Sequence, residues 1–263
     1  MRNKPLATRG PLAAVFATLV CLSAGSALGA ESINPHADDL LRSMSDYLSN
    51  AKAFSVTASV SNEFLTTEGE KLQLNSHSEL LVERPAHIRV ARRGRFADVE
   101  LYFDGANLTA HGKTVNAYVQ QPLEGTIDDA IFAMERETGM SLPGADLLLS
   151  NPYAVLSSGV VSSGYHGRAF VDGVEAHHLS FRTAEVDWQL WVKVGDEPLP
   201  VKYVITTKWL TGAPQYSVQL TNWNLTPKIA RGQFTFAAPQ GAVKLDAFPV
   251  DETGEVLVVQ EGQ

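Results

Sequence analysis

The sequence predicts an α+β fold built on one strongly curved antiparallel sheet, an unclosed half-barrel whose concave face is covered by two or three helices. An amphipathic helix precedes the first strand, and strands with a two-residue alternation follow one another for most of the chain. Two further helical segments interrupt these strands. Parallel βαβ units are excluded because the chain has too few helical segments to connect parallel strands.

The first 30 residues have the pattern of an export signal. Basic side chains precede an apolar run over residues 11–22, and small residues fill positions 23–30. This run is shorter than the roughly 20 residues that a membrane-spanning helix needs. We therefore expect residues 1–30 to be a signal peptide cleaved near Gly29 or Ala30. Residues 31–263 are then a single domain released into the periplasm, and the protein is not membrane-spanning.

The chain has one cysteine, Cys21, and it lies within the predicted leader. The residue before it is Val20, whereas a lipid-attachment motif requires a small residue there, so we expect no lipid anchor. After cleavage the domain has no cysteine, so it folds without disulfides or thiolate metal sites. The leader carries three basic residues and no acidic one, so its loss changes the net charge from -8 to -11. This charge argues against nucleic acid and anionic membranes as partners.

A helix is predicted over residues 37–52, where apolar side chains recur at intervals of three and four and acidic residues occupy the first turn. The period then changes to two over residues 54–61, as in a strand with one buried face. Further strands are predicted at 71–82, 87–92, 99–103, 107–111, 115–119, 160–170, 174–182, 186–194, 200–208 and 215–224.

Turn signals predict that neighbouring strands pair as hairpins. These signals are Asp104-Gly105, His111-Gly112 and Asp172-Gly173. A second helix is predicted from the N-cap Thr126 to the stop at Gly139, and residues 145–149 add one helical turn. The sheet formed by these strands has one strongly apolar face, and the helical segments are the available cover for it.

Six segments resemble, in order and spacing, a family of predicted periplasmic proteins known as domain of unknown function 2092. They are residues 103–109, 125–129, 177–181, 186–191, 198–202 and 234–239. That family is similar in shape to the bacterial lipoprotein carriers (the LolA/LolB-like superfamily) and to an envelope-stress regulator. The resemblance implies an unclosed barrel with helices in its mouth and an apolar groove for acyl chains or a lipidated partner. It implies no catalytic residues.

The residues form no clear catalytic or metal-binding pattern. The chain has no Gly-x-Ser-x-Gly elbow, and the domain has no thiol nucleophile. Asp187 beside Trp188 and Asp172 near His178 could form acid and base pairs, but turn and solvent-facing aspartates are the ordinary explanation in an acidic exported protein. Adjacent strand residues His177 and His178 point to opposite faces and cannot share one ion, and pairing either with His166 leaves no third ligand. We predict no enzyme activity, no cofactor and no metal.

Two surface features are candidates for partner contacts. Arg89, Arg93 and Arg95 lie on one face of an extended strand, where they either contact an anionic headgroup or acidic partner or simply solvate the sheet. Trp191 lies on the polar side of its strand and is either an exposed contact residue or covered by another segment.

The predicted function is non-catalytic binding of a hydrophobic ligand, a lipid or a lipidated protein, in the cell envelope, with transport as one use. The alternative is a periplasmic protein-interaction module in envelope-stress sensing or assembly, in which an envelope protein is the partner. An open cavity between sheet and helices distinguishes the first from the second. The predicted ligand wall comprises Leu41, Met44, Leu48, Phe54, Val56, Ala58, Leu72, Leu74, Leu80, Val82, Ile88, Val90, Trp188, Leu190, Tyr203 and Ile205.

Overall fold

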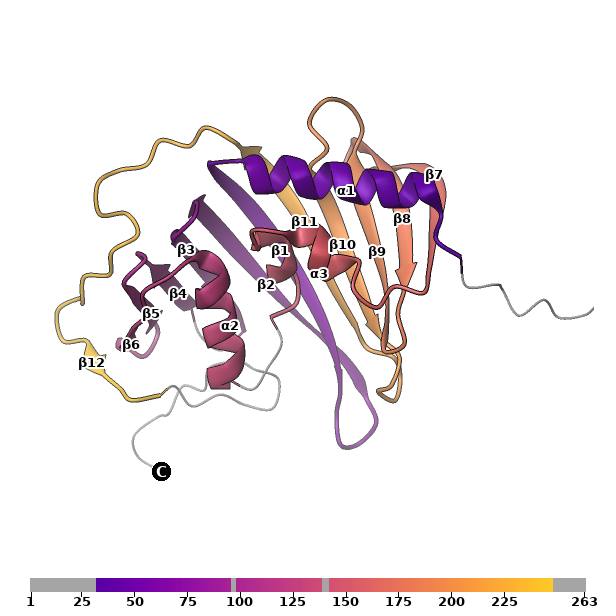
Figure 1. Ribbon diagram of the computed structural model, residues 1–263. Helices are drawn as coiled ribbons and strands as arrows, with labels where there is room; N and C mark the ends of the chain where they lie inside the picture. Colours follow the sequence, from indigo (N-terminus) through magenta and orange to yellow (C-terminus); the bar gives the residue numbers. More distant parts are fainter. Residues whose placement is uncertain (1–31, 96–97, 139–141, 248–263) are drawn as a thin grey trace, which may run out of the picture. The chain divides into compact units, whose positions relative to one another are not determined.

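One twelve-stranded sheet organises the described residues, and it is antiparallel except at one edge. The computed structural model describes residues 32–95, 98–138 and 142–247, which belong to the unit Glu31–Gln263 (Figure 1). The predicted leader and its cleavage site lie outside the described residues. The spatial order of the strands is β12-β6-β5-β4-β3-β2-β1-β11-β10-β9-β8-β7. The sheet is open and curved, which confirms the predicted fold class.

The strands agree closely with those that the alternation predicts. Their bounds are β1 (Ala53–Leu65), β2 (Lys71–Glu83), β3 (His87–Arg93), β4 (Asp98–Phe103), β5 (Asn107–Gly112), β6 (Ala117–Pro122), β7 (Ser162–Val171), β8 (Val174–Arg182), β9 (Val186–Lys193), β10 (Pro200–Thr207), β11 (Gln215–Asn224) and β12 (Val243–Lys244). The long central strand β1 pairs with β2 on one side and with β11 on the other. It therefore joins the early strands to the late ones.

Two of the three predicted turns connect strands, and one prediction was wrong. Asp104 accepts hydrogen bonds from two following backbone N–H groups, and Gly105 has φ +83°, as a tight turn requires. Asp172 and Gly173 both have positive φ in the turn between β7 and β8. Gly112, in contrast, is the last residue of β5. The turn that follows ends at Asn116, whose φ of 48° is left-handed, a conformation that asparagine tolerates.

The helices cover one face of the sheet (Figure 1). They are α1 (Pro35–Asn50), α2 (Ile127–Thr138) and α3 (Pro152–Leu156), with a 3-10 turn η1 (Ala145–Leu148) before α3. The Asn34 side chain accepts the Ala37 N–H at 3.0 Å and starts α1, two residues earlier than predicted. At α2, the Thr126 backbone N–H donates to Asp129 at 2.8 Å, while the Thr126 hydroxyl accepts from the Asp129 N–H. The predicted stop at Gly139 lies outside the described residues.

The last described segment, residues 225–247, passes over the outer face of the early strands. Phe234 is buried and stacks on His87, with ring centroids 5.2 Å apart. Phe236 lies 5.0 to 5.6 Å from the rings of Tyr102, His111 and Tyr118. The segment then adds β12 in parallel to β6. A small second core thus forms on the outer face, and it buries the polar side chains of Thr109 and His111.

Candidate functional site

The predicted ligand wall lies on the helix-covered, concave face, and most of it is packed core. Leu41, Met44 and Leu48 of α1 are fully buried against the sheet. Eight wall residues of the strands are buried in the same core: Phe54, Val56, Ala58, Val82, Ile88, Trp188, Leu190 and Tyr203. Three more, Leu80, Val90 and Ile205, are partly buried against it. Beneath α1, side chains therefore fill the space between sheet and helix.

Leu72 and Leu74 continue the same face toward the tip of the β1–β2 hairpin. Both are half-buried, and neither belongs to the buried core. The register places Phe64 opposite Leu72, and Phe64 is half-buried as well. Figure 1 shows the hairpin extending beyond α1 and α3. The apolar face thus has a covered part and a partly exposed part.

A clamp of polar side chains joins α1 to α3. The Arg42 Nη2 donates to the Tyr153 hydroxyl at 2.7 Å, and that hydroxyl donates to Asp38 Oδ1 at 2.8 Å. The Arg42 guanidinium also lies 3.8 Å from the centre of the Tyr153 ring. Because these contacts hold the two helices together, α1 and α3 form one continuous cover.

Acidic and phenolic side chains interrupt the apolar interior near η1. Asp146 lies within hydrogen-bonding reach of the Tyr203 hydroxyl, at 3.5 Å, and Tyr216 also interacts with it electrostatically. Burial raises the pKa of the Asp146 carboxyl, and the charge of Glu135 raises it further. The interior at this point therefore disfavours a second negative charge.

Removing the charge of Asp146 is expected to stabilise the protein. Because the folded-state pKa is raised, this carboxyl contributes stability below its unfolded pKa of about 3.9 and loses that contribution as pH rises through the folded pKa. Asp146→Asn should therefore raise the melting temperature at pH 7.5 and lose this advantage near pH 4. Thermal unfolding followed by circular dichroism at both pH values measures this, with the exposed Asp196→Asn as control. A lower melting temperature at pH 7.5 would contradict the interpretation.

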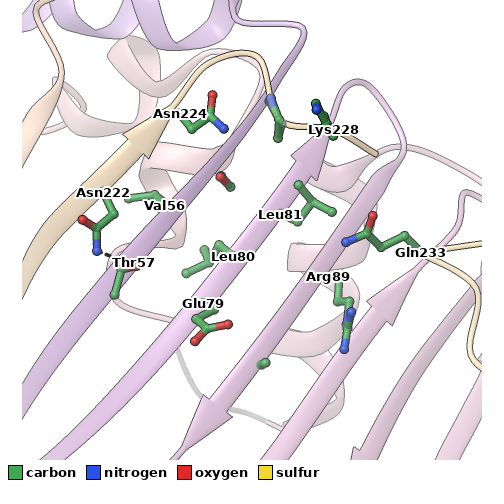
Figure 2. A pocket seen from close by; sticks show the side chains of 13 residues that line it. Val56, Thr57, Glu79, Leu80, Leu81, Arg89, Asn222, Asn224, Lys228 and Gln233 are labelled. Carbon is green, nitrogen blue, oxygen red and sulfur yellow. Dashed lines mark hydrogen bonds between the residues drawn. The ribbon is translucent and has the colours of Figure 1, made fainter. Parts of the chain in front are cut away.

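Small hydroxyl side chains line the outer face of β1 and leave hollows there. Ser55, Thr57, Ser59 and Ser61 alternate with the inward residues of this strand. The first hollow, about 450 Å³, is formed by β1, β2, β3 and β11 together with residues 227, 228 and 233 of the segment after β11. Figure 2 shows its mixed lining, with Glu79 and Arg89 on one side and Asn222 and Asn224 on the other.

A second hollow of about 540 Å³ lies farther along the outer face of β1. Its charged or titratable lining residues are His77, Arg93 and Lys202. A third hollow, about 370 Å³, lies where α1 ends and α2 begins. There Arg84 Nη1 donates to the Leu148 carbonyl at 2.7 Å, whereas Arg84 Nε and Nη2 are buried with no hydrogen-bond partner among the described residues.

The structure separates the three predicted contact arginines. Arg89 pairs with Glu100 at 3.3 Å and lies over the Tyr102 ring. Burial acts to raise the pKa of the Glu100 carboxyl, but hydrogen bonds from Tyr102 and Lys113 and the charge of Arg89 hold it below its usual value. Arg93 lines the second hollow, and Arg95 is exposed beyond the end of β3. Arg89 and Arg93 share the outer face of β3, as predicted, but they line different hollows, and Arg89 is paired with Glu100.

The histidines occupy both faces of β8, as the alternation predicts. His177 contacts Tyr165 and His36, while His178 faces outward and stacks on Trp191 with ring centroids 4.2 Å apart. His166 lies 4.9 Å from His178. Within the described ranges, no group of three or more His, Cys, Asp or Glu side chains is placed to hold a metal ion. Trp191 is half-buried and contacts its cross-strand neighbours His178 and Lys202.

The sequence matches the family described as "Predicted periplasmic protein (DUF2092)" over residues 37–247, which is most of the chain. The chain belongs to this family. The match confirms the resemblance seen in the six sequence segments, and the family description places this DUF2092 protein in the periplasm. No curated protein matches the chain.

Several solved structures are distantly similar to this DUF2092 protein. An uncharacterized conserved protein from Thermus thermophilus has 10% identity and a TM-score of 0.48, covering 80% of this chain and 98% of its own. The Mycobacterium tuberculosis lipoprotein LppX has 12% identity, a TM-score of 0.42, and coverage of 75% and 100%. A LolA superfamily protein from Nitrosomonas europaea has 11% identity, a TM-score of 0.37, and coverage of 76% and 97%. None of these similarities identifies a ligand.

Sequence reasoning missed the outer-face hollows of this DUF2092 protein. Ser59 and Gln219 are opposite one another only because β1 pairs with β11, and this pairing joins distant parts of the sequence. The run of Ser and Thr on the outward side of β1 is the one local signal that could have indicated these hollows.

In the part of the chain that the structure describes, no helix is both long and apolar enough to cross a membrane.

Proposed function

We propose that the protein is a non-catalytic periplasmic binding protein that holds a lipid acyl chain, free or attached to a lipidated partner. The observation that carries this proposal is the extension of the apolar concave face beyond its helical cover. Leu72, Leu74 and Phe64 are apolar, half-buried and outside the packed core. Burying such surface against an acyl chain releases about 25 cal/mol for each Å² removed from water.

The polar interior near Asp146 favours a lipid whose headgroup is uncharged or lies far from Asp146. A fatty carboxylate inserted as far as Asp146 and Glu135 would meet their negative charge. The bound lipid is therefore expected to lie with the end of its acyl chain toward the covered core and its headgroup toward the tip of the β1–β2 hairpin. We expect a lipid ligand to bind without a cofactor.

A fluorescent fatty-acyl probe tests this proposal. The protein without its leader should bind the probe with a dissociation constant of micromolar order, about -8 kcal/mol. Leu74→Asp should weaken binding at least about tenfold, because it places a charge against the acyl chain, while its half-exposed position limits the cost to folding. Asn75→Asp, on the outward side of the same strand, is the matched control. Met44→Trp is less informative because Met44 is fully buried and overpacking destabilises the fold.

The packing beneath α1 favours a second candidate function. Because Leu41, Met44 and Leu48 have no exposed surface, the covered part of the concave face is filled as an ordinary core would be. A protein-interaction module in the envelope has such a core and binds its partner on its outer surface. If neither the acyl probe nor lipid extracted with the natively exported protein is bound, the interaction module is the better interpretation.

A further inference from the structure

The second outer-face hollow differs in chemistry from the concave face. It is open to solvent, measures about 540 Å³, and has one apolar lining residue, Val60. The other lining residues are Ser59, Ser61, Asn75, Ser76, His77, Arg93, Lys202, Ser217 and Gln219. None of them is a carboxylate, although the domain is strongly acidic overall. The hollow therefore suits a hydrophilic, negatively charged ligand.

The basic side chains form two separate poles. Arg93 on β3 and His77 on β2 are direct cross-strand partners. Lys202 on β10 pairs across the sheet with Gln219 of β11. Strands β1 and β11 lie between His77 and Lys202, so their backbones are about 14 Å apart at the usual strand spacing. A ligand that reaches both poles needs two acidic groups joined by a spacer.

Both poles are available for a ligand. Arg93 and His77 form no ion pair with any described residue, in contrast to Arg89 in the neighbouring hollow. The Lys202 ammonium lies 5.2 Å from the Trp191 ring centre, and Trp191 is itself held by stacking on His178. This contact restricts the position of the ammonium without placing a carboxylate beside it. Asp98 lies opposite Arg93 in the register and Glu79 is two residues from His77, but neither lines the hollow.

The floor between the poles carries hydroxyl and amide groups. Ser59 is the cross-strand partner of both His77 and Gln219, so these side chains lie in one row from pole to pole. The Ser61 Oγ is buried and has no hydrogen-bond partner among the described residues. Because this oxygen is buried, the contacts of the floor with a ligand come from Ser59, which is exposed, and from Gln219, which is half-buried. Such a floor matches a spacer that is itself rich in hydroxyl groups.

We infer that this hollow binds a soluble saccharide bearing two acidic groups, phosphate or carboxylate. Arg93, with His77 beside it, receives one acidic group through the paired N–H groups of its guanidinium. Lys202 receives the other, and the row of Ser59 and Gln219 bonds the sugar hydroxyls. The site lies on the opposite face of the sheet from the proposed acyl site, so it is a second binding function and does not depend on the first.

Isothermal titration calorimetry of the exported protein with fructose 1,6-bisphosphate, fructose 6-phosphate, fructose and inorganic phosphate tests this inference. The bisphosphate should bind most tightly and the uncharged sugar most weakly. Arg93→Gln and Lys202→Gln should each lower the affinity for the bisphosphate at least about tenfold, the loss of one hydrogen bond to a charged group. Lys193→Gln changes the net charge equally from the outer face of β9, outside the hollow, and should retain the affinity.

Several results would overturn the inference. Equal affinity for fructose and the bisphosphate would remove the role of charge, and equal affinity for inorganic phosphate would remove the saccharide. A loss in Lys193→Gln as large as that in Arg93→Gln would show that only net charge matters. Leu74→Asp should leave bisphosphate binding unchanged, so failure of the acyl site and failure of this site are told apart.

Discussion

Leu190→Asp is expected to destabilise the protein by at least about 4 kcal/mol, enough to prevent folding if the native stability is ordinary. Leu190 is fully buried in the centre of β9, and its cross-strand partners Leu179 and Tyr203 are buried as well. An aspartate there loses the leucine packing and buries a charge with no cation opposite it. Urea unfolding followed by tryptophan fluorescence measures the change in the free energy of unfolding.

Two further variants of β9 make this result interpretable. Gln189→Asp places the same charge one residue away on the outer face of β9, on the side of His178. It should change stability by no more than about 0.5 kcal/mol. Leu190→Ala, which buries no charge, should cost about 2 to 5 kcal/mol and keep the loss measurable. A Leu190→Asp protein as stable as Gln189→Asp would mean that the faces of β9 are exchanged.

The difference between Leu190 and Gln189 shows which parts of the fold are predictable from sequence. A half-buried strand alternates with a period of two, so the inward face of β9 follows from Val186, Trp188 and Leu190 alone. Hairpin partners follow from the turns between them. Short elements lack this signal, and neither the five-residue helix α3 nor the two-residue strand β12 was predicted. Their positions depend on tertiary contacts such as the Tyr153 clamp.

The candidate sites were harder to predict than the fold for the same reason. The inward residues of the concave face were predicted, but not which part the helices leave uncovered, because helix placement is a tertiary property. The second outer-face hollow combines Arg93 and His77 from early strands with Lys202 from a late strand. Local sequence groups Arg93 with Arg89 instead, and the structure shows that Glu100 neutralises Arg89.

The second large effect is expected in the segment over the outer face, a feature that no sequence period predicts. Phe234→Ala should cost about 3 kcal/mol, because Phe234 is buried and stacks on His87. The loss of stability should be greatest within residues 225–247 and the strands beneath them. At the end of this segment, β12 is held beside β6 by two hydrogen bonds, from Val243 N–H to the Asn116 carbonyl and from Leu245 N–H to the Tyr118 carbonyl. Once the anchor is removed, these amides should exchange with solvent faster than those of β9.

Hydrogen exchange read by mass spectrometry separates this local opening from global unfolding. If the segment detaches, peptides covering β5, β6 and residues 225–247 gain deuterium, while those covering β8 to β10 stay protected. Thr235→Ala is the control, since Thr235 is exposed and lies between the two phenylalanines. A buried polar group favours this opening: detachment lets water reach His111, whose Nε2 is buried without a hydrogen-bond partner among the described residues. Uniform loss of protection across the sheet would mean instead that the outer segment and the main core unfold as one unit.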